Sequence, residues 1–118
     1  MRGEGRVAER LATVSADRLA VPSVVAFELR YGLLRIGAGP RRSAELTQLL
    51  NALTPLAFDA AAAELAARLR ADLEAHGESI SSFDLLIAAT ALAHNAVLVT
   101  RNRREFERVA LLQIEDWY

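Results

Sequence analysis

Apolar residues recur at helical spacing along most of the chain, and short apolar runs separate the resulting helices. The spacing of three or four residues predicts a short amphipathic helix over residues 5–16. The same pattern predicts further helices over residues 24–37, 41–53, 59–77 and 83–95. The intervening apolar runs are typical of strands and cover residues 18–23, 54–58, 96–100 and 111–118. The continuous apolar run over residues 96–100 is typical of a strand buried on both faces of a parallel sheet. Because strands alternate with helices, the pattern predicts an α/β fold with a mostly parallel sheet.

Capping and turn residues set the boundaries of these elements. Ser23 is placed to cap the helix over residues 24–37, which ends at a Gly-Ala-Gly-Pro breaker. Asp59 opens an alanine-rich helix that stops at Gly77. The polar segment 101–109 is predicted to be a loop or a single turn.

The composition bounds the possible functions. The chain has 118 residues, 53% of them hydrophobic, which is enough for one domain over residues 1–118 with its own core. A net charge of −1 means that any contact with nucleic acid must come from a local basic patch. The absence of cysteine excludes disulfides and thiolate metal sites. The apolar runs are too short for a membrane span and no apolar signal segment is found, so we expect a cytoplasmic protein.

Asp84 is the only formally charged residue between positions 83 and 99. With Ser81 it forms the serine-x-x-acid pattern of a capping box, in a first turn where a negative charge suits the helix dipole. This reading explains the carboxylate without any chemistry. The alternative is a ligand-binding carboxylate, because α/β proteins place ligands where a helix begins after a loop.

Glu28 falls on the apolar side of its predicted helix. At about 100° per residue it shares this side with Phe27, Tyr31 and Leu34. A buried carboxylate is costly unless it is paired, protonated or bound to a metal. A pair with Arg35 or a more distant arginine is one reading. The other is a magnesium site of a phosphodiesterase, since Mg²⁺ prefers oxygen ligands.

The segment after the strand over residues 96–100 carries the other polar candidates. Asn102 and Glu105 can supply oxygen ligands at the carboxyl edge of the sheet, where open α/β sheets bind ligands. The same segment holds the only dense basic cluster of the chain, Arg101, Arg103, Arg104 and Arg108. Taken alone, it is a solvated turn capped by Asn102. Beside Glu28 and Asp84 it becomes an edge suited to phosphate contact.

Three other residues have structural interpretations. Phe27 and Tyr31 are predicted to belong to the core rather than to a base-stacking platform. His94 lies at a helix end, where it suits the negative end of the dipole. The sequence contains no convincing glycine-rich phosphate loop or serine–histidine–acid arrangement.

Three stretches of the chain resemble the PIN-domain family, in particular the VapC-type toxins of bacterial toxin–antitoxin pairs. They are VPSVVAFELRYGL, FDLLIAATALAHNAVLVTRNRREFERV and LQIEDW, in the order found in the family. The resemblance covers nearly the whole chain and implies a PIN-like three-layer α/β/α fold. It also implies cleavage of RNA with Mg²⁺ or Mn²⁺, homodimers or higher oligomers, and inhibition by a cognate antitoxin. FELRYG and the IEDW ending are similar to members that cut initiator tRNA.

The resemblance further implies roles for individual residues. Glu28 matches the acid of the family's ELRYG helix, and Asp84 matches the acid that opens the helix after the central loop. Asn102 falls where the family often has aspartate or asparagine, and Glu105 on the acidic position before the phenylalanine. The expected metal ligands are therefore Glu28, Asp84 and Asn102, with Glu105 assisting catalysis. The arginines expected to meet the RNA backbone are Arg101, Arg103 and Arg104.

One feature of the family is expected to be missing. Its members normally begin with an apolar strand ending in an aspartate that is a principal metal ligand. This chain begins at a point that resembles the loop after that strand, where Glu4 is a poor substitute. Loss of the aspartate would weaken metal binding, and loss of a central strand would uncover a sheet edge that invites association.

The leading hypothesis is a VapC-like endoribonuclease whose activity is reduced if its first strand is missing. The alternative is a non-catalytic PIN remnant that binds an antitoxin or its own copy. The missing aspartate favours the remnant, whereas Glu28, Asp84 and Asn102 favour the enzyme. A third reading is a generic α/β domain whose carboxylates only cap helices or form salt bridges.

Overall fold

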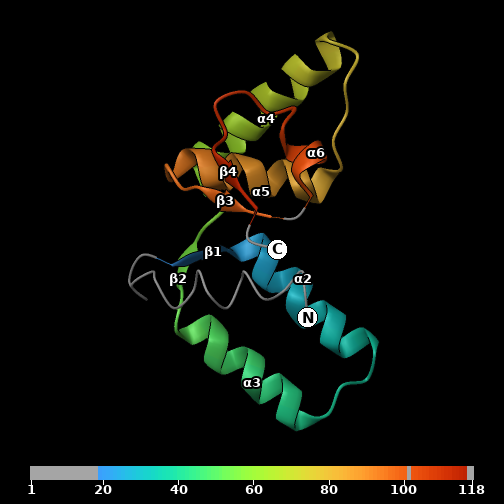
Figure 1. Cartoon of the computed structure of the whole chain (residues 1–118), viewed down its shortest axis with the longest axis vertical. Helices are drawn as coiled ribbons and strands as arrows, with labels where there is room; N and C mark the ends of the chain where they lie inside the picture. The colour runs from blue at the N-terminus through green and yellow to red at the C-terminus, as the bar shows by residue number, and fades with distance from the viewer. Residues whose placement is uncertain (1–18, 101, 117–118) are drawn as a thin grey trace.

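The computed structural model describes residues 19–100 and 102–116. Its elements are β1 (Ala20–Pro22), α2 (Ser23–Arg35), α3 (Pro40–Asn51), β2 (Thr54–Leu56), α4 (Ala60–Ala75), α5 (Ser82–Ala93), β3 (Leu98–Val99), α6 (Arg103–Phe106) and β4 (Ile114–Glu115). Figure 1 shows α4, α5, α6, β3 and β4 gathered in one part of the molecule, while α2 and α3 extend away from it. The predicted helix over residues 5–16 lies outside the described residues.

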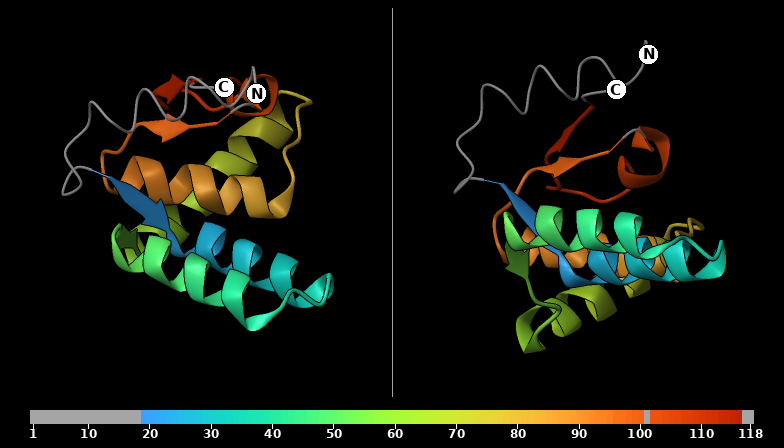
Figure 2. Two further views of the ribbon diagram at one scale, coloured as in Figure 1. Left: turned by 60° about the horizontal axis from the view of Figure 1, so that its bottom comes forward. Right: turned by 90° about the horizontal axis from the view of Figure 1, so that it is seen from below.

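Both pairs of strands are parallel, as predicted. In the register of the first pair Ala20 of β1 lies opposite Thr54 of β2, and in the second Leu98 of β3 lies opposite Ile114 of β4. Within the described residues the strands form two separate two-stranded sheets. Figure 2 shows helices on different sides of these strands, which agrees with the predicted layered α/β fold.

The strand predicted over residues 96–100 is shorter and less buried than expected. Leu98 is buried in the core, but Val97 and Val99 are exposed. Successive side chains of a strand point to opposite faces, so only the face that carries Leu98 packs against the helices. The prediction of a strand buried on both faces is therefore wrong.

Two of the three predicted helix caps are present. Asp59 Oδ1 accepts a hydrogen bond from the Ala62 N–H at 3.0 Å, and Ser81 Oγ accepts one from the Asp84 N–H at 3.3 Å. Ser23 does not cap α2, because the helix already includes it and the capping position falls one residue earlier on a proline, whose side chain has no hydrogen-bonding group.

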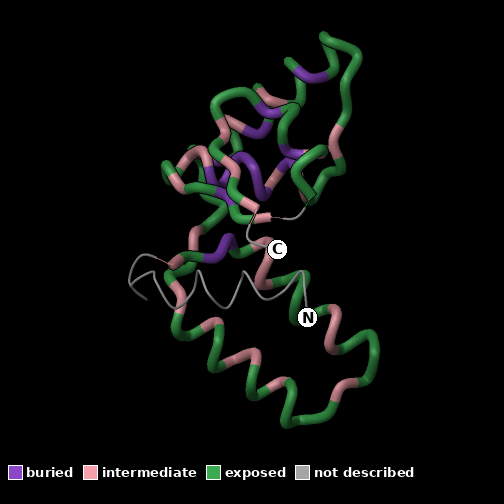
Figure 3. Tube along the Cα trace, in the orientation of Figure 1, coloured by how far each residue is buried: buried purple, intermediate pink, exposed green. Residues whose placement is uncertain are grey.

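The core lies where α5 packs against α4, α6 and β3. Residues 88–91 of α5, Ala-Ala-Thr-Ala, are almost completely buried. Such small side chains let the neighbouring helix approach closely at native packing density. Ile87, Leu98 and Phe106 belong to one buried cluster on this helix, and Figure 3 shows the buried segments concentrated in this part of the molecule. The apolar run around Asp84 is thus explained as the central helix of the core.

Helices α2 and α3 contain no buried residue. They lie side by side, and Nη1 of Arg30 on α2 donates a hydrogen bond to Thr47 Oγ1 on α3 at 3.2 Å. Only the first turn of α2 reaches the core cluster, through the half-buried Val24 and Val25. In the part of the chain that the structure describes, no helix is long and apolar enough to cross a membrane.

Truncation of a leucine in the central helix should destabilise the fold. Leu85 is 5% exposed and packs in a cluster with Ala66 and Ala89. We expect Leu85→Ala to lower the free energy of unfolding by about 2–5 kcal/mol, since it leaves a cavity. Leu34→Ala is the matched control, because Leu34 is helical but 77% exposed. Urea denaturation measures both variants, and equal losses would contradict the assignment of the core to α5.

Candidate active site

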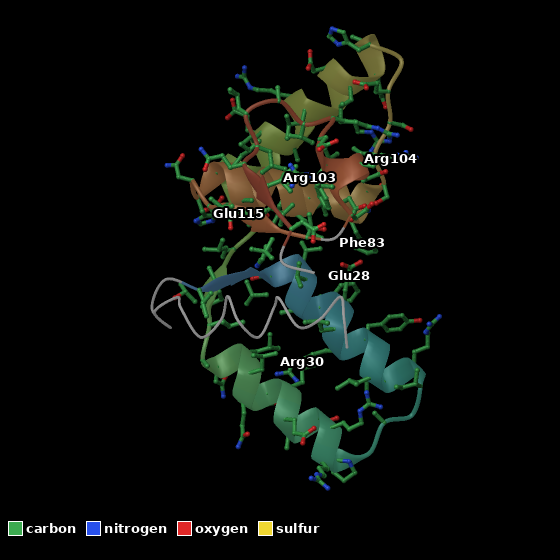
Figure 4. All side chains as sticks on the ribbon, in the orientation of Figure 1. Glu28, Arg30, Phe83, Arg103, Arg104 and Glu115 are labelled. Carbon is green, nitrogen blue, oxygen red and sulfur yellow. The ribbon has the colours of Figure 1, made fainter. Side chains whose placement is uncertain are left out.

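The site forms where α2 passes the start of α5. The rings of Phe27 on α2 and Phe83 on α5 are in contact, with their centroids 5.7 Å apart. Glu28 and Asp84 each directly follow one of these phenylalanines in the chain. Figure 4 shows Glu28 next to Phe83 between the two helices. The structure therefore brings the two principal predicted acids to the same junction.

Glu28 is exposed, and so are the Phe27 and Tyr31 rings on its side of α2. The predictions that this side is buried and that both rings belong to the core are therefore wrong. The reason is that only the first turn of α2 packs on the core, so the remainder of the helix stands beyond α5 (Figure 1). Among the described residues no arginine forms an ion pair with Glu28, which leaves its carboxylate available.

The predicted capping box at the start of α5 is only half formed. Its first hydrogen bond runs from the Asp84 N–H to the Ser81 hydroxyl. In a complete box the acid would in turn accept a hydrogen bond from the Ser81 N–H. That N–H instead donates to Oε2 of Glu105 at 3.3 Å. The half-buried Asp84 carboxylate consequently has no hydrogen bond or ion pair with any described residue.

Glu105 belongs to a small network that fastens α6 to the loop before α5. Its Oε1 atom lies 3.7 Å from Nη1 of Arg108, and this group also donates a hydrogen bond to the Ser79 carbonyl oxygen. Phe106 is buried in the core cluster. Glu105 and Arg108 therefore both bond to the backbone of residues 79–81. Through the Ser81 N–H, Glu105 contacts the segment that precedes Asp84.

Helix α6 carries two of the three arginines predicted to bind RNA (Figure 4). Nε of Arg103 lies 3.1 Å from Oε2 of Glu107, and both side chains are exposed. Exposed pairs of this kind contribute about 0–1 kcal/mol, so a phosphate can readily replace the carboxylate. Arg104 is exposed and has no ion pair among the described residues. Arg101 lies outside the described residues.

Asn102 occupies the position just before α6, but its side chain makes no capping hydrogen bond. Its backbone N–H donates to Thr100 Oγ1 at 3.0 Å. The prediction that Asn102 caps a turn through its side chain is therefore wrong, and Asn102 takes part in the turn only through its own backbone N–H. The Asn102 amide is exposed, and its role as a metal ligand stays a prediction.

The two histidines take part in other contacts. His94 follows the last residue of α5, as its predicted place at a helix end requires, and its Nε2 lies 3.1 Å from the Ala57 carbonyl oxygen. The pKa of His76 is raised above its usual value by a hydrogen bond to the Asp72 backbone carbonyl and, next, by the Asp72 carboxylate. The His76 ring is therefore accounted for by the end of α4, and the His94 ring by a contact with the connection between β2 and α4.

Sequence reasoning missed an open groove beside Glu28, which we call the aromatic groove. Its volume is about 370 Å³, and its lining consists of Phe27, Glu28, Tyr31, Gly32, Arg35 and Phe83. The Phe27 and Tyr31 rings are nearly parallel, with an angle of 14° and centroids 6.4 Å apart. Four-residue spacing along a helix predicts that such rings are neighbours, but it cannot show whether another element covers them.

The sequence of this chain matches the family described as the PIN domain over residues 2–112. The chain belongs to the PIN-domain family. It is 35% identical over 104 residues to a protein of Shigella flexneri named tRNA(fMet)-specific endonuclease VapC, covering 88% of this chain and 79% of the relative. It is also 37% identical over 101 residues to ribonuclease VapC2 of Rickettsia felis, covering 86% and 75% of the two chains.

Solved structures confirm the PIN-domain fold. The DNA-bound VapBC structure from Salmonella typhimurium superimposes with a TM-score of 0.90 at 32% identity, covering 97% of this chain and 86% of that chain. The homologues of this PIN domain are VapC ribonucleases, which occur in VapBC toxin–antitoxin complexes. The resemblance to VapC-type toxins is thus confirmed. The prediction of a missing first strand and aspartate falls on residues outside the described part and stays a prediction.

PIN-domain nucleases generally depend on a divalent metal. Within residues 19–100 and 102–116, no three acidic, histidine or cysteine side chains are grouped to hold a metal. Mg²⁺ sites on phosphate substrates often use only one or two carboxylates and fill the remaining positions with water and phosphate oxygens. Glu28 and Asp84 have no ion pair among these residues, so they suit an Mg²⁺ site that uses two carboxylates and is completed by water and phosphate oxygens.

The contact between Ser81 and Glu105 should protect the start of α5 from local opening. We expect Glu105→Ala to speed amide hydrogen exchange in the first turn of α5 and to cost about 1 kcal/mol of stability, since the Ser81 N–H loses its acceptor. Glu105→Gln keeps a carbonyl oxygen and should preserve most of the protection. Glu107→Ala, on the same segment but paired with Arg103, is the control. Unchanged exchange in Glu105→Ala would contradict this role.

Proposed function

We propose that this PIN domain is a metal-dependent endoribonuclease toxin of a toxin–antitoxin pair, with a cognate antitoxin as its inhibitor. Its substrate is RNA, and tRNA is a candidate because of the activity named for the Shigella flexneri relative. The observation that carries the proposal is that the Asp84 carboxylate has no hydrogen bond or ion pair with any described residue, at the junction of α2 and α5 that also carries Glu28. An acid that only completed the capping box would accept a hydrogen bond from the Ser81 N–H.

Each predicted residue receives a role that its contacts permit. Glu28 and Asp84 would hold Mg²⁺ or Mn²⁺, and the exposed Asn102 amide would add an oxygen ligand. When bound, such an ion supplies positive charge to the phosphodiester and lowers the pKa of the attacking water. Glu105 is assigned as a positioning residue that acts through Ser81. The phosphate contacts are assigned to Arg101, Arg103 and Arg104.

The same proposal covers the organisation of the protein. Residues 1–118 form a single PIN-like domain, and the chain acts in the cytoplasm, where its RNA substrates are. Its exposed apolar residues on α2 and directly after it include Leu29 at 43% and Ile36 at 60% exposure, which favours association into a homodimer or a higher oligomer.

A non-catalytic PIN remnant that binds an antitoxin or its own copy is the second candidate. It is favoured by the small number of acids grouped in the described part of the site. A divalent ion held by two carboxylates is surrounded by less negative charge than one held by three, and it binds more weakly. The remnant would have the same fold without a measurable response to metal.

Metal-dependent RNA cleavage tests the proposed function. We expect the chain to cleave initiator tRNA or a short unstructured RNA with Mg²⁺ or Mn²⁺. Glu28→Gln and Asp84→Asn should each lower the rate by at least about 100-fold, because loss of a ligand costs more than loss of its supporting contacts. The metal should also raise the melting temperature of the wild type but not of Asp84→Asn. Asp72→Asn on the exposed side of α4 is the matched control.

Two outcomes decide between the candidates. A wild type that neither cleaves RNA nor gains stability from metal would overturn the enzyme and support the remnant. Cleavage that persists in Asp84→Asn would exclude Asp84 from the active site. Asp84 would then have only a structural role at the start of α5. Glu105→Gln should retain most of the activity if Glu105 acts through Ser81, whereas a metal ligand at this position would make it as damaging as Asp84→Asn.

Binding of RNA should depend on salt through the arginines of α6. For single strands the slope of log affinity against log salt is about −0.7 for each phosphate that is neutralised. We therefore expect Arg104→Ala to reduce the slope by about 0.7 and to weaken binding of every RNA sequence equally. Arg41→Ala on α3, whose side chain is 91% exposed, should leave the slope unchanged. Equal slopes for the wild type and Arg104→Ala would exclude this contact.

A further inference from the structure

The aromatic groove presents three rings to solvent next to Glu28. Phe27, Tyr31 and Phe83 are 54%, 55% and 46% exposed. Rings of this size normally contribute to a core or an interface, because each buries a large apolar area. Three of them in contact at one exposed site indicate a surface that receives a ligand.

The lining of the aromatic groove distinguishes between classes of ligand. Among the described residues it contains aromatic rings, a carboxylate, a guanidinium group and a glycine, but no aliphatic side chain. The exposed aliphatic residues Leu29 and Leu34 of α2, and Ile36 directly after it, lie outside the groove. Apolar peptides and second copies of a chain are held by aliphatic as well as aromatic contacts, whereas nucleobases stack on rings and on guanidinium planes.

The two charged residues of the groove fix the direction of such a ligand. Glu28 and Arg35 are seven residues apart, which corresponds to about 10 Å along the helix axis. Glu28 belongs to the proposed cleavage site, and Arg35 has no ion pair among the described residues. A nucleotide whose base lies on the aromatic rings of the groove would therefore have Glu28 of the cleavage site on one side. On its other side, the Arg35 guanidinium group would contact the next phosphate.

Gly32 leaves room for this ligand between the charged residues. A Cβ atom built on Gly32 would meet no atom within 4 Å, so the groove is open above it. Glycine in the interior of a helix is less favourable than alanine. A Cβ at this position would therefore project toward the groove without a clash inside the protein.

We propose that the aromatic groove is a binding subsite for one unpaired nucleobase of the RNA, adjacent to the phosphodiester that is cut. The base stacks on Tyr31 and Phe27, and Arg35 contacts the flanking phosphate. Because a base inside a duplex cannot reach the rings, the subsite restricts the enzyme to loops and single strands. This inference rests on the proposed function and names the part of the substrate that the site recognises.

The test is binding of a short single-stranded RNA that carries one 2-aminopurine, whose fluorescence falls when the base stacks on a ring. The full chain is titrated without divalent metal, so that binding is measured apart from cleavage. Tyr31→Ala should weaken binding by about 5- to 100-fold and relieve the quenching. Tyr31→Trp should retain both. Leu34→Ala is the control on the same helix, because it removes an exposed apolar side chain outside the groove.

Gly32→Leu provides a second variant that keeps all three rings and improves helix propensity. It should block the aromatic groove and weaken binding as much as Tyr31→Ala, while its melting temperature stays at or above that of the wild type. The same RNA annealed to its complement should bind the wild type more weakly than the single strand does.

The outcomes separate this inference from the proposed function. Quenching that depends on Tyr31 in a chain without cleavage supports the subsite although the enzyme fails. Cleavage and RNA affinity unchanged in Tyr31→Ala and Gly32→Leu overturn the subsite although the enzyme stands. Variants that change the mass of the protein in solution, or its affinity for an antitoxin peptide, but not its RNA affinity assign the groove to a protein partner and also overturn the subsite.

Discussion

The start of α5 depends on one hydrogen bond from another part of the chain, donated by the Ser81 N–H to Glu105 of α6. Helix α5 contains the largest set of buried residues, so its position determines the core. A free N–H at a helix start has to be satisfied, and here a distant acid does so in place of the acid in the first turn. Glu105 therefore takes the place that the first-turn acid would have in a complete capping box, and the Asp84 carboxylate has no hydrogen bond or ion pair with any described residue.

The distribution of burial explains why the site lies at the edge of the core. Helix α5 is packed on α4 along its small residues, whereas α2 touches the core only with its first turn. Glu28 and Phe27 sit directly after that turn, where the backbone is still fixed by packing but the side chains are open to solvent. These residues therefore combine a backbone that packing holds in place with side chains that a ligand can reach. A binding site needs both properties.

Local signals in the sequence were sufficient for the parallel strands, for the helices within the described residues and for the caps at Asp59 and Ser81. They failed where the outcome depended on distant parts of the chain. The periodicity of α2 shows which residues share a side, but not that the Phe27 and Tyr31 rings stay more than half exposed. The pattern at Ser81 predicts a capping box, but the competing contact from Glu105 is set by tertiary structure, 24 residues along the chain. The family resemblance located the candidate acids but not the aromatic groove.

The absence of buried residues in α2 and α3 has a consequence for the lifetime of the protein. Separation of these two helices exposes little additional apolar surface, so it costs less free energy than unfolding of the core. Proteases require an extended backbone and cut preferentially at small residues in exposed loops. The Gly37–Gly39 connection between α2 and α3 would therefore be cut before the core opens. A ligand on α2 raises the cost of this separation by mass action, so the occupied protein would be degraded more slowly than the free one.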